Sequence, residues 1–113
     1  MEILVTDVSD RVTKVTLEGR LDTSGVDRVE TKFLAACTTG GSHALVDLSK
    51  VTFIASMGIR MLISASRAMT LRKTKLVLFS PQPTVSDVLN HTALGDVIPI
   101  AADEKSAIAL IEV

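Results

Sequence analysis

The sequence contains few of the residues that form disulfides or aromatic binding surfaces. Its 113 residues include one cysteine, three phenylalanines, and neither tryptophan nor tyrosine. A single cysteine excludes a disulfide within the chain and is typical of a reducing compartment. Hydrophobic residues nevertheless make up 47% of the chain, so the core must be built from aliphatic side chains. The length predicts one domain, residues 1–113, whose core needs no covalent cross-link.

Long apolar runs and an excess of charge of one sign are also missing. The net charge of −1 gives no attraction to nucleic acid or to an anionic membrane, so we expect no direct nucleic-acid partner. The N-terminus lacks the basic segment and apolar run of a signal peptide. No stretch approaches the roughly 18 consecutive apolar residues that span a bilayer. These absences predict a cytoplasmic protein with no membrane insertion.

The sequence also lacks the motifs of common catalytic sites. His43 and His91 have no metal-ligand spacing to another histidine or to a cysteine. A glycine-rich phosphate loop, a dinucleotide-binding motif and a Gly-x-Ser-x-Gly elbow are all missing. Cys37 lies on an apolar helical stripe and is interpreted as a small buried hydrophobic residue. We therefore expect no enzyme activity, no cofactor and no metal site.

The first third of the chain predicts a hairpin followed by a helix. Two short runs rich in β-branched residues, 3–8 and 12–17, are separated by a polar turn, which is typical of an antiparallel hairpin. A helix follows, with Ser24 as its cap and Asp27 near its positive end. Gly40-Gly41 is expected to end this helix. Its apolar residues recur at helical spacing and form an inner face of Val26, Val29, Phe33 and Cys37.

Strands and helices then alternate toward the C-terminus. Buried strands are expected at 44–48 and 76–79, and a short edge strand at 97–100. Ser80 is expected to cap a short helix and Asp103 a final one. Because crossovers between neighbouring strands are right-handed, these strands should run parallel. We therefore predict an α/β fold, in which one mixed sheet of about five strands opens with an antiparallel hairpin and packs against about four helices.

The stretch from Val46 to Ile59 leads from a buried strand into a helix expected at 56–71. Ser56 stands at the joint, where its oxygen can accept hydrogen bonds from the first helical N–H groups, so Ser56 is a candidate N-cap. The helix dipole favours negative charge there, so a phosphate on Ser56 would also be well placed. The expected inward face carries Ile59, Leu62, Ile63 and Ser66. A flanking stripe, interpreted as core packing or as an adaptable partner surface, carries Met57, Met61, Ala65 and Ala68.

This stretch resembles the signature of the STAS domain family, the anti-sigma factor antagonists. The family carries Asp-Ser-x-Gly after a Val-Asp-Leu-Ser-type strand. Here Val46-Asp47-Leu48-Ser49 is followed by Ser56-Met57-Gly58, and Ala55 stands in place of the family's Asp. A second family element, Gly-x-Leu-Asp, is matched by Gly19-Arg20-Leu21-Asp22. The resemblance covers essentially the whole chain and implies a STAS-like single domain.

The resemblance implies a binding protein that is switched by phosphorylation. Such antagonists bind an anti-sigma factor with serine kinase activity while unphosphorylated, are released when the serine is phosphorylated, and are reset by a phosphatase. The phosphoacceptor would be Ser56, and ATP would belong to the kinase. The expected topology puts Asp22 at the same end of the sheet, where it orients the Ser56 hydroxyl, contacts the partner or caps the first helix. The partner-binding residues are then expected to be Asp22, Ser24, Ala55, Met57, Gly58, Arg60 and Met61.

Two other functions are compatible with the same residues. A STAS-like subunit of a signalling scaffold or lipid-transport complex would use the same helix for docking, with Ser56 serving only as a cap; Ala55 favours this alternative. A small nucleotide- or metabolite-binding domain would instead bind its ligand without any partner.

Overall fold

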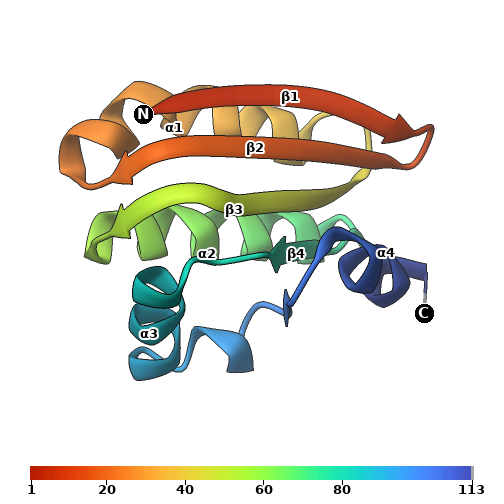
Figure 1. Cartoon of the computed structure of the whole chain (residues 1–113). Coiled ribbons are helices and arrows are strands. Elements are labelled where there is room, and N and C mark those ends of the chain that lie inside the picture. Colours follow the sequence, from red (N-terminus) through yellow and green to blue (C-terminus); the bar gives the residue numbers. More distant parts are fainter. Residues whose placement is uncertain (113) are drawn as a thin grey trace.

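The computed structural model describes residues 1–112 and contains one five-stranded sheet packed against helices (Figure 1). The strands are β1 (Glu2–Ser9), β2 (Val12–Leu21), β3 (His43–Ile54), β4 (Leu76–Phe79) and β5 (Ile100–Ala101). The helices are α1 (Thr23–Thr38), α2 (Ser56–Leu71), α3 (Pro83–His91), the 3-10 helix η1 (Leu94–Asp96) and α4 (Glu104–Glu112).

The strands lie in the sheet in the order in which they occur in the chain. β1 and β2 form an antiparallel hairpin, and every later neighbour pair is parallel. The predicted mixed α/β sheet with an N-terminal hairpin is therefore confirmed. The helical connections between β2, β3 and β4 are what allow these strands to run parallel, because a tight turn can join only antiparallel strands.

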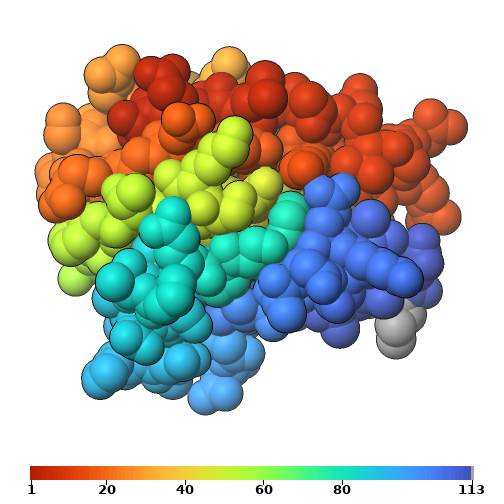
Figure 2. All heavy atoms as spheres, in the orientation of Figure 1, coloured from red at the N-terminus to blue at the C-terminus, as the bar shows by residue number. Residues whose placement is uncertain are grey.

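Side chains that alternate along the central strands divide the core into two clusters. Ala44, Val46 and Leu48 of β3 belong to the larger cluster, which is covered by α1, α2 and α3. Leu45 points to the other face and packs with residues of β4 and α4. In Figure 1, α1 and α2 lie behind the sheet, and α4 covers only one end of its front. The front of β1 and β2 carries no helix, so their side chains form part of the surface in Figure 2.

The first helix folds as its sequence pattern predicts. Its buried residues are Gly25, Val26, Val29, Phe33 and Cys37, which include the whole expected inner face. The glycine pair after the helix adopts positive φ angles of 82° at Gly40 and 69° at Gly41, a conformation that glycine reaches without steric cost. Burial raises the pKa of the Cys37 thiol to about 12, as expected for a packed hydrophobic residue.

The inward face predicted for the second helix is correct at Leu62 and otherwise rotated from the observed one. The residues of α2 that are buried are Gly58, Met61, Leu62, Ala65 and Met69. Ile59, Ile63 and Ser66 are only partly buried, since they lie at the margin of the contact. Of the flanking stripe, Met61 and Ala65 are core residues, whereas Met57 and Ala68 are partly buried. Met69 joins Met61 in filling the space between α2 and the sheet.

Two predicted boundaries near the C-terminus are also corrected. Ser80 does not cap α3; Gln82 occupies the cap position, and Pro83 is the first helical residue. The last strand is Ile100–Ala101 and not 97–100, because η1 reaches Asp96 and Val97 still has helical dihedral angles. Asp103 does cap α4, as predicted, and accepts a hydrogen bond of 2.8 Å from the Ser106 N–H.

None of the helices within residues 1–112 combines the length and the apolar character that crossing a bilayer would require.

Candidate functional site

The site is assembled where β2 and β3 end together. Leu21 and Ile54 are paired in the parallel register, and the Ala55 N–H donates to the Leu21 carbonyl oxygen at 3.0 Å. The next residues of each strand start a helix, so the N-termini of α1 and α2 lie at the same end of the sheet (Figure 1). The predicted meeting of the Asp22 loop with the Ser56 segment thus follows directly from strand register.

Asp22 is the N-cap of α1, which leaves Ser24 inside the first turn. One carboxylate oxygen of Asp22 accepts a hydrogen bond from the Gly25 N–H at 2.8 Å. The other lies 3.3 Å from the Arg20 guanidinium. The hydrogen bond from Gly25, helped by Arg20, lowers the pKa of Asp22. The predicted cap at Ser24 is therefore wrong, and Ser24 is an exposed residue next to the site.

Ser56 is not the N-cap of α2, and this corrects the first expectation for that residue. Ala55 holds the cap position, with extended backbone angles and no side-chain hydrogen bond. Ser56 is the first helical residue, and its side chain is exposed. The first turn of α2 contains no acidic residue, so the positive end of this helix is offset neither by a cap nor by a carboxylate.

Two residues assigned to the partner surface belong to the interior. Met61 is 1% exposed and packs in the main core cluster. Gly58 is buried against β2, where a Cβ atom would lie 2.8 Å from Leu21 Cδ2 and 2.9 Å from the Leu21 carbonyl oxygen. The glycine of the Ser-x-Gly motif thus allows α2 to approach β2, and neither residue presents a side chain to a partner.

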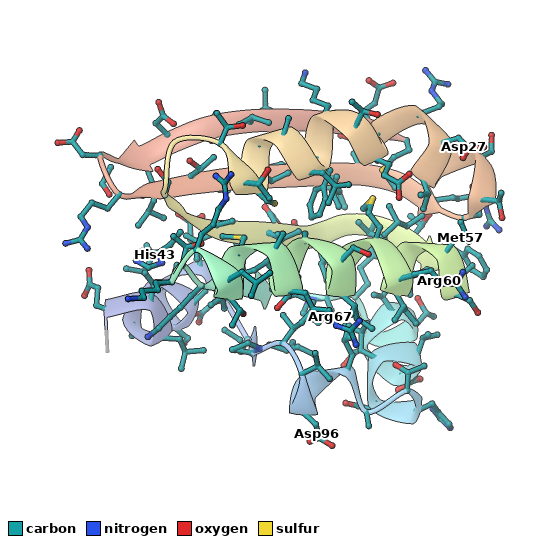
Figure 3. All side chains as sticks on the ribbon, turned by 180° about the vertical axis from the view of Figure 1, so that it is seen from behind. Asp27, His43, Met57, Arg60, Arg67 and Asp96 are labelled. Carbon is teal, nitrogen blue, oxygen red and sulfur yellow. The ribbon has the colours of Figure 1, made fainter. Side chains whose placement is uncertain are left out.

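The remaining predicted residues surround the N-terminus of α2. Arg60 is exposed one turn after Ser56, and Met57 and Ala55 are partly buried beside it. Figure 3 shows Met57 and Arg60 at the same end of the molecule as Asp27 of α1, and His43 at the other end. Ser56, Arg60 and Asp22 therefore form one surface that a partner could contact.

Sequence patterns did not single out an aromatic residue at this end. The Arg20 guanidinium lies 4.3 Å from the centroid of the Phe53 ring, which is 37% exposed. Arg20 also pairs with Asp22, so one arginine joins the end of β3 to the cap of α1. In β3, Val51 and Ile54 are buried and the two residues between them are exposed, so strict alternation, which would put Phe53 on the same face as Val51, gives no signal for its position.

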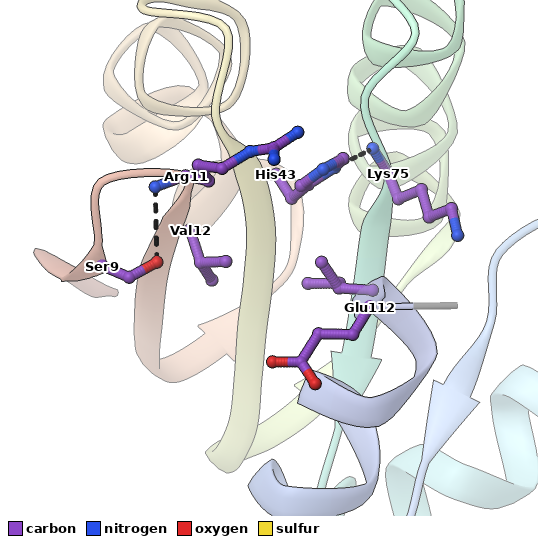
Figure 4. Close-up of a pocket in the computed structure, with 7 residues that line it drawn as sticks. Ser9, Arg11, Val12, His43, Lys75 and Glu112 are labelled. Atoms are coloured by element: carbon purple, nitrogen blue, oxygen red, sulfur yellow. Dashed lines mark hydrogen bonds between the residues drawn. The ribbon is translucent and has the colours of Figure 1, made fainter.

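A separate pocket of about 480 Å³ lies at the opposite end of the sheet (Figure 4). It is lined by Ser9, Arg11, Val12, His43, Lys75, Ile111 and Glu112. His43 Nδ1 accepts a hydrogen bond of 2.9 Å from the Lys75 backbone N–H, which ties the start of β3 to the segment before β4. Within residues 1–112, no three His, Cys, Asp or Glu side chains are grouped so that they could hold a metal ion.

Comparison with known proteins places this geometry in a family. The STAS domain model matches residues 4–107, which include both strand ends and both helix N-termini described above. This chain belongs to the STAS domain family. The Ser56-Met57-Gly58 and Gly19-to-Asp22 segments, which resemble the family's motifs, lie within the matched range and at the same end of the sheet.

Relatives and solved structures of this family resemble the chain over nearly its whole length. A Bordetella bronchiseptica protein named "Putative anti-sigma factor antagonist BtrV" is 23% identical over 106 residues, 94% of this chain and 91% of that protein. The structure of the unphosphorylated anti-sigma factor antagonist SpoIIAA has a TM-score of 0.81 and 22% identity, covering 98% of this chain and 96% of that one. The phosphorylated form of Bacillus SpoIIAA has a TM-score of 0.72 and 22% identity, covering 97% and 99%. The fold of the chain is thus that of anti-sigma factor antagonists.

The contact between Gly58 and Leu21 predicts an unusual sign for a helical glycine-to-alanine change. Alanine normally stabilises a helix interior relative to glycine by about 1 kcal/mol. We expect Gly58→Ala instead to lower the free energy of unfolding by about 1–3 kcal/mol, because the added methyl group overlaps Leu21. Urea unfolding measures the change. Gly95→Ala is the control, since a Cβ there would meet only Ile100 Cδ1 at 3.8 Å; equal effects of the two changes would contradict the packing argument.

The position of the helix cap predicts how two neighbouring substitutions differ. Ser56→Ala should change the free energy of unfolding by less than about 0.5 kcal/mol, because no cap is lost. Ala55→Asp should raise it by about 1 kcal/mol, because a carboxylate at the cap position can accept from the first helical N–H groups. Thermal and urea unfolding of both variants check this pair. A clear loss of stability in Ser56→Ala would mean that the hydroxyl caps α2 in solution.

The contact between His43 and Lys75 predicts a dependence of stability on pH. Burial, and then the charges of Arg11 and Lys75, lower the pKa of His43 below 6.5. Protons therefore bind the unfolded chain more readily, so the stability contribution of His43 is present above pH 6.5 and is lost as the pH falls through the folded pKa. His43→Gln keeps an acceptor for the Lys75 N–H without titrating. Unfolding midpoints measured on both sides of pH 6.5 should fall less steeply on acidification in His43→Gln than in the wild type; parallel curves would exclude this role.

Proposed function

We propose that this chain is an anti-sigma factor antagonist that binds its anti-sigma factor while Ser56 is unmodified and is released when Ser56 is phosphorylated. The observation that carries the proposal is the exposed Ser56 hydroxyl at the first helical position of α2, beside the loop of Asp22. The similarity of the chain to BtrV and to the anti-sigma factor antagonist SpoIIAA supports the antagonist part. SpoIIAA has been solved in a phosphorylated and an unphosphorylated form, which supports the switch.

The electrostatics of α2 support a switch that leaves the fold intact. A phosphate adds a charge of about −1.5 to −2 at neutral pH. At Ser56 this charge meets the uncapped positive end of a helix whose first turn has no carboxylate, and Arg60 lies one turn further on. The folded chain therefore accommodates the phosphate, and the change falls on the surface that faces a partner. There it opposes an acidic group or is buried without a counter-charge, and binding is lost.

In this proposal the chemistry belongs to the partners. The anti-sigma factor is a serine kinase that binds ATP and transfers its γ-phosphoryl group to the Ser56 hydroxyl, releasing ADP, and a phosphatase later hydrolyses the phosphate from Ser56. The chain itself is a binding protein in the cytoplasm, with no cofactor and no catalytic residue, and Asp22, Ser24, Ala55, Met57 and Arg60 surround the phosphoacceptor.

The first test uses wild-type and Ser56→Asp chains as baits in a native lysate, with mass spectrometry as the readout. We expect an anti-sigma factor kinase to bind the wild type and to be lost from Ser56→Asp. Ser56→Asp should at the same time keep or slightly raise thermal stability, by about 0.3–1 kcal/mol, because its carboxylate lies at the helix N-terminus. Loss of binding through misfolding is thereby distinguished from loss through charge.

A second measurement separates phosphorylation from docking. The captured kinase, given labelled ATP, should phosphorylate the wild type and fail to label Ser56→Ala, which should still bind. Capture of a scaffold or transporter subunit equally by wild type and Ser56→Asp would contradict the switch. That result would favour the alternative in which Ala55 marks a STAS domain outside a phosphorylation cycle.

A further inference from the structure

Charge is distributed very unevenly along this chain. Residues 48–86 contain six lysines and arginines and no aspartate or glutamate, although the whole chain has 12 basic and 13 acidic residues. The acid-free segment includes all of α2 and the loop that follows it. Its basic residues are Lys50, Arg60, Arg67, Arg72, Lys73 and Lys75.

The outer face of α2 presents part of this charge to solvent. Arg60 and Arg67 are two turns apart and therefore lie on one side of the helix. Both are exposed, and the ion pairs among residues 1–112, Lys14–Glu104 and Arg20–Asp22, involve neither of them. Figure 3 shows both arginines on the side of α2 that faces away from the sheet.

The same face ends in an apolar groove. The groove has a volume of about 380 Å³ and is lined by Ser66, Arg67, Thr70, Leu71 and Val97. Leu71 is 87% exposed and Val97 is 55% exposed, although leucine and valine side chains favour burial. Covering these side chains removes apolar surface from water, so two of them beside an arginine form a site to which a partner can bind favourably.

We propose that this groove, with Arg67 at its rim, docks an acidic protein segment that carries an aliphatic side chain. The aliphatic group would cover Leu71 and Val97, and a carboxylate would pair with Arg67, whose guanidinium can donate two parallel hydrogen bonds to the carboxylate oxygens. Arg67 lies about 16 Å along α2 from Ser56, since the two residues are 11 positions apart in the helix. The groove is thus a second docking surface, whose occupancy does not depend on the modification of Ser56.

Two other occupants fit these observations less well. Nucleic acid is held by several cations along its phosphates and by stacked aromatic rings, whereas the groove has one arginine and no aromatic residue among its lining. A second copy of this chain could supply acidic residues, but docking them on α2 is a head-to-tail contact, which leads to rings or open filaments and not to a simple symmetric dimer. An acidic segment of another protein matches both the charge and the apolar lining.

The test uses the full chain and a fluorescent helical peptide with leucines along one face and glutamates beside them. The matched control peptide has glutamine in place of each glutamate. We expect the acidic peptide to bind with an affinity that falls as salt is added. Its binding should shift the backbone amide signals of Arg67, Leu71 and Val97 in two-dimensional NMR spectra. Equal binding of the glutamine peptide, shifts at another surface, or no binding would overturn the proposal.

Four variants assign the interaction to this groove. Arg67→Glu should lower the affinity for the acidic peptide by about fivefold to tenfold, because the attraction between the arginine and the peptide's glutamates becomes a repulsion. Leu71→Ser should lower the affinity for both peptides, because it removes an exposed apolar side chain from the groove and leaves the core unchanged. Asp96→Asn removes the carboxylate next to Val97 and should strengthen binding. Lys105→Glu, on α4 across the sheet, is the matched charge reversal and should have no effect.

The remaining outcomes are decided with the same samples. Concentration-dependent dimers that disappear in Leu71→Ser would assign the groove to a second copy and reject the heterologous partner. Tighter binding of a DNA duplex than of the acidic peptide would likewise reject it. Ser56→Asp should bind the peptide as the wild type does. Peptide binding therefore tests the groove independently of the proposed switch at Ser56.

Discussion

The parallel pairing of β2 with β3 is the constraint on which the site depends. Its last step is the hydrogen bond from the Ala55 N–H to the Leu21 carbonyl oxygen, which brings two helix starts to one end of the sheet. Gly58 then lies directly on Leu21, so the first turn of α2 is held against β2 with no room for a side chain. The exposed Ser56 therefore stands on a rigid support, and a charge added there changes the surface without needing to move the backbone.

The inner and outer faces of α2 have different roles, because only the inner face packs on the sheet. Met61, Leu62, Ala65 and Met69 fill the space over the sheet, and this requirement leaves no freedom for a partner on that side. The outer face carries no packing requirement, yet it has arginines and no acidic residue. Acidic side chains near the N-terminus of a helix stabilise it through the helix dipole, and α2 has none there. The basic, acid-free composition of the outer face is therefore better explained by what the face binds than by helix stability.

Much of the fold could be predicted because the patterns in this chain are local and regular. Val26, Val29, Phe33 and Cys37 recur at helical spacing, and the structure buries all four. The rotation of α2 could not be read in the same way, because apolar residues occur almost all around this helix and only contact with the sheet chooses among them. The predicted cap of α1 was wrong for a related reason. Ser24 and Asp22 can both act as an N-cap, and Asp22 does so because β2 ends at the residue before it.

Ala55 connects the correction at the cap with the proposed switch. In the family motif an acidic residue precedes the serine, and at this position it would occupy the N-cap and place a negative charge at the start of α2. With Ala55 that charge is missing, so the helix N-terminus stays electropositive until a phosphate or an acidic partner arrives. In the proposed switch, the electrostatic contrast between unmodified and phosphorylated Ser56 is then larger than it would be beside a permanent carboxylate. Ala55 therefore leaves unchanged the position of α2, which depends on Leu21 and Gly58. In the proposed switch, it makes the electrostatic field at Ser56 depend more strongly on whether Ser56 carries a phosphate.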